Sequence, residues 1–455
     1  MEVELKFRIA PRDIERLRRC PALRGIRPRR RSMLALYFDT PDELLAAHGM
    51  ALRVRREGQR WVQALKGGGR SGGALHARDE WEARSADGSL DLARLRHTPL
   101  AGLPGAERLH ERLSVLFQVE VERTTWLARP ARGVKLEVAL DVGAVRHADA
   151  SDAVSEVEIE CKAGPDDAAF EFAGRLLAQV PLVPSAVTKA QRGYRLVHGE
   201  QVQPAHAQPA TVEPDMSVGE GASAVLAAAL AQLLANAEGI ATGADPEFVH
   251  QLRVALRRLR SALRVFRRPL GKFRVRELRA PLRGITRQAG RARDLGRALA
   301  SRGFARAVLE VARMLHAAPA ATDARGLRDY MAARLRKAER ALRRVSASFE
   351  TLDAAARHRV RIDAKRLRYA LDACAGLFPR KRVKEYGAVL ARLQDALGDA
   401  NDARVGAGLL QRLRAPRALA TAGAACLVQQ ENEARHRASL ALERLLRTAA
   451  PWGKR

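Results

Sequence analysis

Carboxylates and cations recur at every second position in several short segments of the first 200 residues. Glu2, Glu4 and Lys6 alternate with apolar residues, and Glu158 and Glu160 do the same later in the chain. Residues two apart in a β-strand share a face, so each row would project from one side of its strand. Hard divalent cations prefer carboxylate oxygens, whereas Arg and Lys bind phosphate oxygens. A surface that presents both suits metal-assisted phosphoryl chemistry.

These rows belong to eight segments in which apolar and polar residues alternate, which is typical of β-strands. The segments are 2–9, 36–40, 51–58, 60–67, 77–84, 117–126, 134–143 and 154–162. Closing eight strands on themselves removes exposed sheet edges. We therefore expect an α+β domain built as an eight-stranded antiparallel tunnel, with helices inserted at 11–20 and 166–179.

The alternative for any one strand is a sheet whose charged face meets solvent. A solvent face usually mixes charges with Ser, Thr and Gln, whereas these rows are nearly pure, and several carry one sign. Arg53 and Arg55 form a cationic pair, and Glu156 opens a row of carboxylates. Taken together, the rows favour a charged lumen.

Charge is distributed unequally along the 455 residues. The chain has 81 Lys plus Arg and 51 Asp plus Glu, a formal net charge of +30. Residues 1–200 hold 33 basic and 28 acidic residues, whereas residues 201–455 hold 48 and 23. Aromatic residues make up only 4%, which disfavours recognition of bases by stacking. The composition predicts a polyanionic partner recognised by charge.

Several classes are disfavoured by simple features. The four cysteines form no C-x-x-C pair, which argues against a disulfide framework or a zinc ribbon and suits a reducing compartment. The charged N-terminus does not resemble a signal peptide, and the apolar run at 222–237 is short for a membrane span. We expect a soluble, cytoplasmic protein without membrane contact, with domains at 1–197 and 219–450 joined by a linker at 198–218.

The second half of the chain contains an internal repeat with helical periodicity. The sequence at 250–253, His-Gln-Leu-Arg, recurs at 358–361 as His-Arg-Val-Arg, an offset of 108 residues. Leu282 and Leu390 keep the same offset. We expect an all-α domain of two pseudo-symmetric four-helix bundles.

Each repeat places a basic stripe beside an apolar seam on one helix. Residues 250–276 contain ten Lys or Arg and no acidic residue. The predicted polyanion-binding residues are His250, Arg253, Arg257, Arg260 and Arg264, and His358, Arg361, Lys365 and Arg368. The alternative for the stripe is a solvent-exposed face, which would carry charges of both signs paired at i and i+4. The alternative for His250 and His358 alone is a role in helix capping or in the core. In the first copy, cations one helical turn apart repel one another, and this repulsion favours a bound polyanion.

The strand half resembles the CYTH superfamily, the triphosphate tunnel metalloenzymes, over residues 1–197. Its start, Glu2-Val3-Glu4-Leu5-Lys6, matches the family's Glu-x-Glu-x-Lys signature. The other matches follow in the family's order: Tyr37-Phe38-Asp39-Thr40, Leu52-Arg53-Val54-Arg55, Ala64-Leu65-Lys66-Gly67, Glu80-Trp81-Glu82, Arg123 before Trp126, the row from Glu156 to Glu160, and Ser185 through Lys189 to Arg192-Gly193-Tyr194.

The resemblance implies a tunnel that binds a triphosphate together with a divalent metal, Mg or Mn. It assigns metal binding to Glu2, Glu4, Glu158 and Glu160, and triphosphate binding to Lys6, Arg53, Arg55, Lys66, Arg123 and Lys189. The residues expected to support in-line attack by water are Glu2, Glu4, Lys6 and Lys189. Which of the carboxylates in the row from Glu156 contacts metal stays open. The family includes inorganic triphosphatases, thiamine triphosphatases and class IV adenylyl cyclases, and the scarcity of aromatic rings favours inorganic triphosphate.

The helical half resembles the CHAD domain over residues 215–450, which implies two four-helix bundles that bind inorganic polyphosphate. The two resemblances together predict a metal-dependent inorganic triphosphatase with a polyphosphate-binding domain. The alternative is a non-catalytic, polyphosphate-binding protein associated with granules in the cytoplasm. A nucleic-acid binder is disfavoured because rings are scarce and no reading helix is evident.

Overall fold

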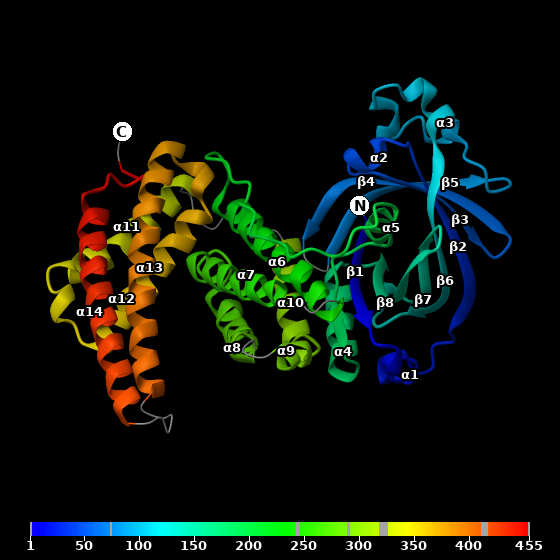
Figure 1. Cartoon of the computed structure of the whole chain (residues 1–455). Helices are drawn as coiled ribbons and strands as arrows, with labels where there is room; N and C mark the ends of the chain where they lie inside the picture. Colours follow the sequence, from blue (N-terminus) through cyan, green and yellow to red (C-terminus); the bar gives the residue numbers. More distant parts are fainter. Residues whose placement is uncertain are drawn as a thin grey trace. The chain divides into compact units, whose positions relative to one another are not determined.

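The computed structural model in Figure 1 describes residues 2–72, 75–242, 245–288, 292–317, 326–410 and 417–453. Up to residue 197 the chain forms an antiparallel sheet with short helices, and from residue 218 onward every regular element in the described ranges is helical. The predicted fold classes of the two halves are therefore confirmed.

All eight predicted strands are present, and most are longer than the alternating pattern indicated. The strands are β1 (Glu2–Ile9), β2 (Arg29–Asp39), β3 (Ala51–Glu57), β4 (Arg60–Gly72), β5 (Leu75–Ser85), β6 (Ser114–Ala128), β7 (Lys135–His147), β8 (Ala150–Ala163) and β9 (Leu182–Pro184). The short β9 was not predicted.

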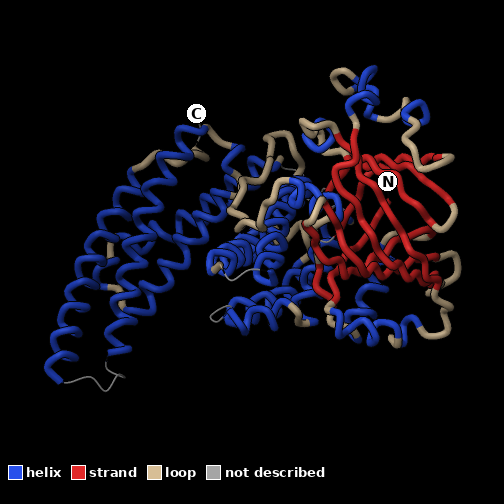
Figure 2. The backbone as a smooth tube through the Cα atoms, turned by 45° about the vertical axis from the view of Figure 1, so that its right-hand side comes forward, coloured by secondary structure: helices blue, strands red, loops and turns tan. Residues whose placement is uncertain are grey.

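The strands form one sheet in the order β5-β4-β3-β2-β6-β7-β8-β1-β9, and an additional pairing of β5 with β1 closes it. Eight strands thus complete a ring, as the red tube in Figure 2 shows. The first half of β1 pairs with β5 and its second half pairs with β9, so both halves of this edge are covered. The predicted eight-stranded antiparallel tunnel is confirmed.

Short helices accompany the sheet. They are α1 (Ile14–Arg18), α2 (Leu44–Ala47), α3 (Leu109–Arg112), α4 (Asp167–Gln179) and α5 (Lys189–Val197). The first and fourth confirm the predicted insertions. The helix α5 follows β9 directly and was not predicted, although its residues belong to the pattern that resembles the family.

The helical half keeps the predicted repeat in its element boundaries. Its helices are α6 (Val218–Thr242), α7 (Pro246–Val265), α8 (Lys272–Gln288), α9 (Ala292–Leu299), α10 (Arg302–His316), α11 (Leu327–Ser346), α12 (Ala354–Asp372), α13 (Arg380–Leu410) and α14 (Arg417–Arg447). The starts of α7 and α12, and those of α8 and α13, lie 108 residues apart.

The two copies also begin their basic helices with the same capping chemistry. Asp245 accepts a hydrogen bond from the backbone N–H of Glu247, and Asp353 accepts one from that of Ala356. An N-cap carboxylate satisfies an N–H group that the helix leaves without a partner. The repeat is therefore preserved in local structure.

By contacts, the described chain divides into two compact units. One comprises residues 1–207, 229–256 and 276–317, and the other comprises residues 208–228, 257–275 and 318–455. Within the first unit, Ala305, Leu309 and Ala312 of α10 belong to the same buried cluster as the outer face of the tunnel. The domain boundaries predicted from sequence mark changes of secondary structure and stay a prediction.

The predicted linker contains no helix or strand between residues 200 and 213. It is nevertheless anchored, because the backbone N–H of Ala205 donates to Asn236 Oδ1 at 3.1 Å. The carbonyl of Ala205 accepts from Asn236 Nδ2 and from Gln232 Nε2 at 2.9 and 3.3 Å. Both amide side chains come from α6 and are buried, so the segment follows a defined path along this helix.

The apolar helix α6 is longer than the sequence indicated. Residues Val218–Ile240 are long and apolar enough to cross a membrane by length and composition, so the expectation that this run is too short was wrong. However, 61% of the most apolar window is buried inside the protein. Burial of this extent is also found in core helices of folded domains.

Gly193 offers a test of how tightly α5 packs. A Cβ at this position would lie inside the van der Waals radius of the buried Phe117 ring, which is stacked on Tyr37. We expect Gly193→Ala to lower the melting temperature, because overpacking costs about 1–3 kcal/mol. Gly174→Ala in α4, where a Cβ meets open space, should raise it slightly. Equal melting temperatures in the two variants would contradict this packing.

Candidate active site

A cavity of about 860 Å³ occupies the interior of the tunnel. Its acidic lining residues are Glu4, Glu57, Asp79, Glu80, Glu82, Glu137, Asp141, Glu158 and Glu160. Its basic lining residues are Lys6, Arg29, Arg31, Arg53, Arg55, Lys66, Arg123, Lys162 and Lys189. With nine residues of each sign, the lumen is close to neutral. The prediction that the charged rows face a shared lumen is thereby confirmed.

Strand register brings the acidic rows together on one wall. In the pairing of β1 with β8, Glu4 lies opposite Glu160 and Lys6 lies opposite Glu158. In the pairing of β7 with β8, Asp141 lies opposite Glu156. Opposite residues on antiparallel strands share a face about 4.5–5.5 Å apart. The register therefore converts sequence spacing into a compact carboxylate cluster.

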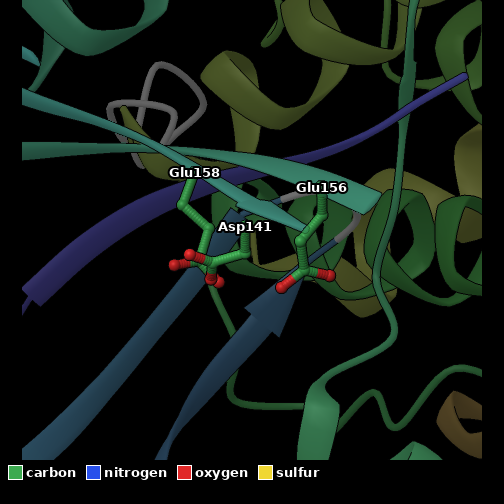
Figure 3. Close-up of side chains that lie close together, drawn as sticks. All are labelled: Asp141, Glu156 and Glu158. Carbon is green, nitrogen blue, oxygen red and sulfur yellow. The ribbon is translucent and has the colours of Figure 1, made fainter. Parts of the chain in front are cut away.

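Three carboxylates converge on the ammonium of Lys189. Asp141, Glu156 and Glu158 offer oxygens that all lie within 4.8 Å of one another. Figure 3 shows these three side chains. Lys189 Nζ lies 2.7 Å from Asp141 Oδ2 and 2.9 Å from Glu158 Oε1, and it also contacts Glu156. The lysine therefore neutralises a cluster that would otherwise be strongly repulsive.

Two further cations complete this charge network. Arg123 binds Asp141 with two hydrogen bonds of 2.7 and 2.6 Å and reaches Glu158 at 2.6 Å. Lys6 Nζ lies 3.1 Å from Glu158 and 3.6 Å from Glu4. Because Glu158 contacts all three cations, it lies at the centre of the network.

Protonation at this centre is governed by burial and by neighbouring charge. Burial acts to lower the pKa of Lys189, but its carboxylate partners, led by Asp141, outweigh burial and hold the pKa well above its usual value. Burial acts to raise the pKa of Glu158, yet Lys189 and the other cations hold it well below its usual range. Burial, followed by repulsion from Glu158, raises the pKa of Glu4. The charged groups at this centre are therefore held in ion pairs. Glu4 is the carboxylate whose charge the neighbouring cations compensate least.

The other wall of the lumen pairs arginines with carboxylates of β5. Arg53 Nη2 donates to Glu80 at 3.0 Å, and Lys66 Nζ lies 2.9 Å from the same carboxylate. Arg55 Nη2 donates to Glu82 at 2.9 Å. The Nε of Arg53 is buried and has no hydrogen-bond acceptor among the described residues. Arg53 therefore keeps one unsatisfied N–H group within its ion-paired side chain.

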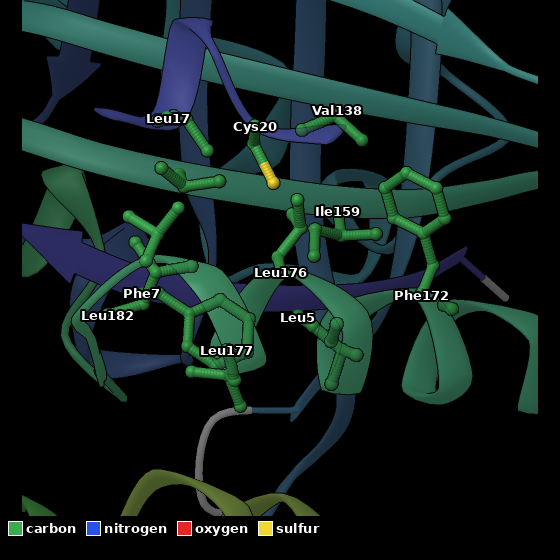
Figure 4. Close-up of a cluster of buried hydrophobic side chains, with 14 of the residues drawn as sticks. Leu5, Phe7, Leu17, Cys20, Val138, Ile159, Phe172, Leu176, Leu177 and Leu182 are labelled. Carbon is green, nitrogen blue, oxygen red and sulfur yellow. The ribbon is translucent and has the colours of Figure 1, made fainter. Parts of the chain in front are cut away.

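The outer face of the acidic wall explains why these strands hold their register. Leu5, Phe7 and Ile159 are almost fully buried and pack against α4, which contributes Leu176 and Leu177 (Figure 4). A shift of one residue would turn these apolar side chains into the lumen and the charges into the core. The hydrophobic contact therefore fixes which charges face inward.

The helix α5 delivers Lys189 to the centre. Thr188 and Gln191 form a capping box, so the helix begins immediately at the lysine. At the other end of the helix, Tyr194 donates to Asp39 at 2.6 Å, and the Tyr194 ring contacts Phe117 edge-on. The lysine is thus placed by contacts that lie outside the charge network.

The carboxylates of the acidic wall fit a divalent cation. Glu4 Oε1 is buried and has no hydrogen-bond partner among the described residues. Glu4, Glu158 and Glu160 line the cavity, whereas Glu156 is 1% exposed and faces the lysines. The cluster that includes Asp141 is close enough for a metal ion but holds an ammonium group. Glu4 and its cavity-facing neighbours are therefore the more accessible metal ligands.

The structure places most of the predicted tunnel residues together. The predicted residues that line the cavity are Glu4, Lys6, Arg53, Arg55, Lys66, Arg123, Glu158, Glu160 and Lys189. The side chain of Glu2 lies outside the described residues. Their individual roles as catalytic, metal or triphosphate residues stay predictions.

Sequence reasoning missed several residues of the lumen. Asp141 lies in the predicted strand segment 134–143, but its contact with Arg123 depends on strand pairing. Arg29 and Arg31 were missed although both line the cavity from β2. The run Arg29-Arg30-Arg31 does not alternate in polarity, so the sequence does not separate the two inward-facing arginines from Arg30.

In the helical half, the basic stripes of both copies are partly buried. On α7, His250, Arg253 and Arg264 are exposed, whereas Arg257 and Arg260 are half-buried. Burial lowers the pKa of Lys365, and repulsion from Arg361 and Arg257 lowers it further. Arg257 comes from the first repeat and Lys365 from the second, so the structure brings cations of both copies close together.

His358 and Arg361 also line a small depression of about 30 Å³. Arg357, Arg404 and Arg435 line it as well, together with a single carboxylate from Glu431. The Nε atoms of Arg361 and Arg435 are buried and have no hydrogen-bond acceptor among the described residues. The charged part of this lining is therefore mainly cationic.

One residue of the second stripe is compensated within the protein. Arg368 Nε lies 3.8 Å from Asp372, and Nη1 donates to Gln394 at 3.4 Å. The sequence-based argument that these cations lack partners therefore does not hold for Arg368. The argument is better supported for Arg361 and Lys365, which form no ion pair with a described residue.

Fold and site together define a closed antiparallel tunnel whose lumen suits a metal-bound polyanion, followed by a basic helical repeat. Residues 1–194 match the family model of the CYTH domain. Residues 224–296 and 294–411 match that of the CHAD domain. The chain therefore combines a CYTH domain, the fold of metal-dependent tunnel enzymes, with a CHAD domain.

The chain is also similar to several proteins of known name or structure. The inorganic triphosphatase of Haemophilus influenzae is 33% identical over 201 residues, 43% of this chain and 54% of that protein. The match thus spans about half the length of the relative. The CHAD domain of Ricinus communis is 27% identical, with a TM-score of 0.46, covering 55% of this chain and 99% of that domain. The Hippeastrum protein HpAC1, described as having a dominant triphosphatase activity, is 19% identical, with a TM-score of 0.33, covering 44% and 97%.

The buried carboxylate Asp141 is predicted to stabilise the tunnel. Asp141→Asn leaves Arg123 and Lys189 short of a buried partner, so we expect a loss of about 3 kcal/mol and a lower urea midpoint by circular dichroism. The control is Glu120→Gln, because Glu120 forms an exposed pair with Arg146 at 3.2 Å. Removing that pair should cost less than about 1 kcal/mol. Equal midpoints for both variants would contradict a structural role for Asp141.

Proposed function

We propose that the tunnel is a metal-dependent inorganic triphosphatase that converts tripolyphosphate to pyrophosphate and phosphate. The observation that carries this proposal is the lumen itself, in which cations and carboxylates are balanced in number and most of the cations are paired with carboxylates. A triphosphate anion alone would disturb this balance. Bound Mg or Mn would offset part of the triphosphate charge.

Different residues of the tunnel would bind the phosphate oxygens and the divalent cation. Arg53, Arg55 and Lys66 are placed to bind phosphate oxygens, exchanging their carboxylate partners for substrate. On the acidic wall, Glu4 with Glu158 or Glu160 would hold the divalent cation. When bound, the cation polarises a phosphoryl oxygen and orients the attacking water.

The centre of the network would act on the terminal phosphate. Arg123 and Lys189 are fixed by carboxylates, and fixed cations stabilise developing negative charge without reorganisation. Lys6 stays protonated, because its carboxylate neighbours raise its pKa despite burial. These cations stabilise the pyrophosphate leaving group, while substrate binding holds the reacting atoms in line.

Inorganic triphosphate is favoured over a nucleotide or thiamine triphosphate by the lining. Among the described residues that line the cavity, Tyr37 and Trp81 are the only aromatic ones, and Tyr37 is stacked on Phe117. An organic ring would therefore find few faces on which to stack. The name of the Haemophilus influenzae relative supports the same choice.

Glu4 tests the catalytic proposal. We expect Glu4→Gln to lower kcat/KM for tripolyphosphate at least about 100-fold, because a metal ligand is lost. Chelation by EDTA should abolish phosphate release by the wild type, and added Mg or Mn should restore it. Phosphate release would be measured for tripolyphosphate, ATP, thiamine triphosphate and long-chain polyphosphate in parallel.

The matched control is Glu82→Gln, which changes a cavity carboxylate on the opposite wall. Glu82 is paired with Arg55 at 2.9 Å and is half-exposed, so we expect a change of less than about tenfold. Both variants should melt near the wild type. If the wild type releases no phosphate from tripolyphosphate with either metal, the tunnel is a binding module and the non-catalytic alternative holds.

We further propose that the helical half binds inorganic polyphosphate, in the cytoplasm and at polyphosphate granules. The supporting observation is the meeting of Arg257, Arg361 and Lys365, whose mutual repulsion lowers the pKa of the lysine after burial. A bound polyanion would offset that repulsion. Nucleic acid remains the competing ligand, and matched competition distinguishes the two.

The helical site is tested by the double substitution Arg361→Gln and Lys365→Gln, made in a Glu4→Gln background that preserves the probe. We expect polyphosphate affinity to fall about tenfold and its salt dependence to become shallower, measured by fluorescence anisotropy. The control removes two exposed cations of the same helix, Arg359 and Arg366. Equal losses in both, or equal competition by DNA of matched charge, would contradict a polyphosphate site.

A further inference from the structure

Two arginines of β2 line the lumen but take no part in its ion-pair network. Arg29 and Arg31 line the cavity on the same face of the strand as Met33 and Tyr37. Neither makes an ion pair or a hydrogen bond with a side chain in the described ranges, whereas Arg53, Arg55, Lys66 and Arg123, like Lys6 and Lys189, are all paired. Among the described residues, these two arginines are therefore not compensated by a carboxylate.

Register connects these arginines with the centre of the site. Arg31 lies opposite Arg123 in the pairing of β2 with β6, and Arg123 contacts Glu158 at 2.6 Å. Arg29 lies two residues further along the strand, about 6.6 Å away in strand geometry. The three arginines form a row from the charge centre to the beginning of β2.

The beginning of β2 is the open end of this row. The opposite end is covered by α5, whose Tyr194 contacts Phe117 near the start of β6 and Asp39 at the end of β2. Lys189, at the start of α5, lines the cavity from that side. A linear anion whose terminal phosphate lies at Lys189 must therefore continue past Arg31 and Arg29.

We propose that Arg29 and Arg31 form an outer subsite that binds phosphates beyond the third of a linear polyphosphate held end-on in the tunnel. This inference rests on the proposed triphosphate site. The subsite recognises charge alone: both side chains are exposed cations, and the inner face of β2 between them and the covered end is apolar, with Met33, Ala35 and Tyr37. A triphosphate is retained by the inner cations, whereas a longer chain gains two additional contacts.

The experiment uses the full chain and long-chain polyphosphate as a competitor of tripolyphosphate hydrolysis at constant free metal concentration. In the double variant Arg29→Gln and Arg31→Gln, we expect the inhibition constant of long-chain polyphosphate to rise about tenfold. The KM for tripolyphosphate should change less than about twofold, because a triphosphate does not reach the outer subsite.

The matched control is Arg30→Gln, which removes a neighbouring exposed cation from the other face of the same strand. It should leave the inhibition constant unchanged. An unchanged constant in the double variant, an equal rise in Arg30→Gln, or a KM that rises as much as the inhibition constant would each overturn the subsite.

Failure of this inference can be distinguished from failure of the proposed function. A wild type that hydrolyses tripolyphosphate while the double variant binds long-chain polyphosphate normally overturns only the subsite. A wild type that does not hydrolyse tripolyphosphate overturns the triphosphatase assignment. In that case, direct binding of long-chain polyphosphate to the same variants tests the subsite, and equal affinities would overturn it.

Discussion

The tunnel depends on one electrostatic arrangement, the ammonium of Lys189 held among Asp141, Glu156 and Glu158. Carboxylates within 4.8 Å of one another would repel strongly in a buried setting without a cation. The lysine supplies that cation from α5, and Arg123 supplies a second from β6. Because Lys189 comes from α5, this helix must dock before the whole carboxylate cluster is compensated, whereas Arg123 and Asp141 already meet in the pairing of β6 with β7.

This arrangement also links catalytic potential to stability. Ion pairs hold these cations in fixed positions when substrate is absent, so the lumen is preorganised. Further from the centre, α5 is tied to the helical half, because Arg195 donates to the buried Glu238 of α6 at 3.2 Å. The element that delivers Lys189 is thus held from two sides.

Much of this could be predicted from sequence, because inner and outer faces of the tunnel strands differ sharply in polarity. Alternation identified the eight tunnel strands, and a fixed offset identified the helical repeat with its Asp-capped helices. Strand register was not predictable, so the pairing of Asp141 with Arg123 was missed. Arg29 and Arg31 were missed because an Arg-Arg-Arg run resembles an ordinary solvated segment.

The two regions proposed to bind phosphate differ in how their cations are compensated. In the tunnel, nearly every cation has a carboxylate partner, so binding requires exchange of partners and favours an anion that brings its own metal. Around Lys365, the neighbouring Arg257 and Arg361 form no ion pair with a described residue, and a bound anion would relieve their mutual repulsion. In the proposed outer subsite, Arg29 and Arg31 extend this second strategy to the beginning of β2. The proposed tunnel would discriminate by metal at its centre and by chain length at this outer subsite.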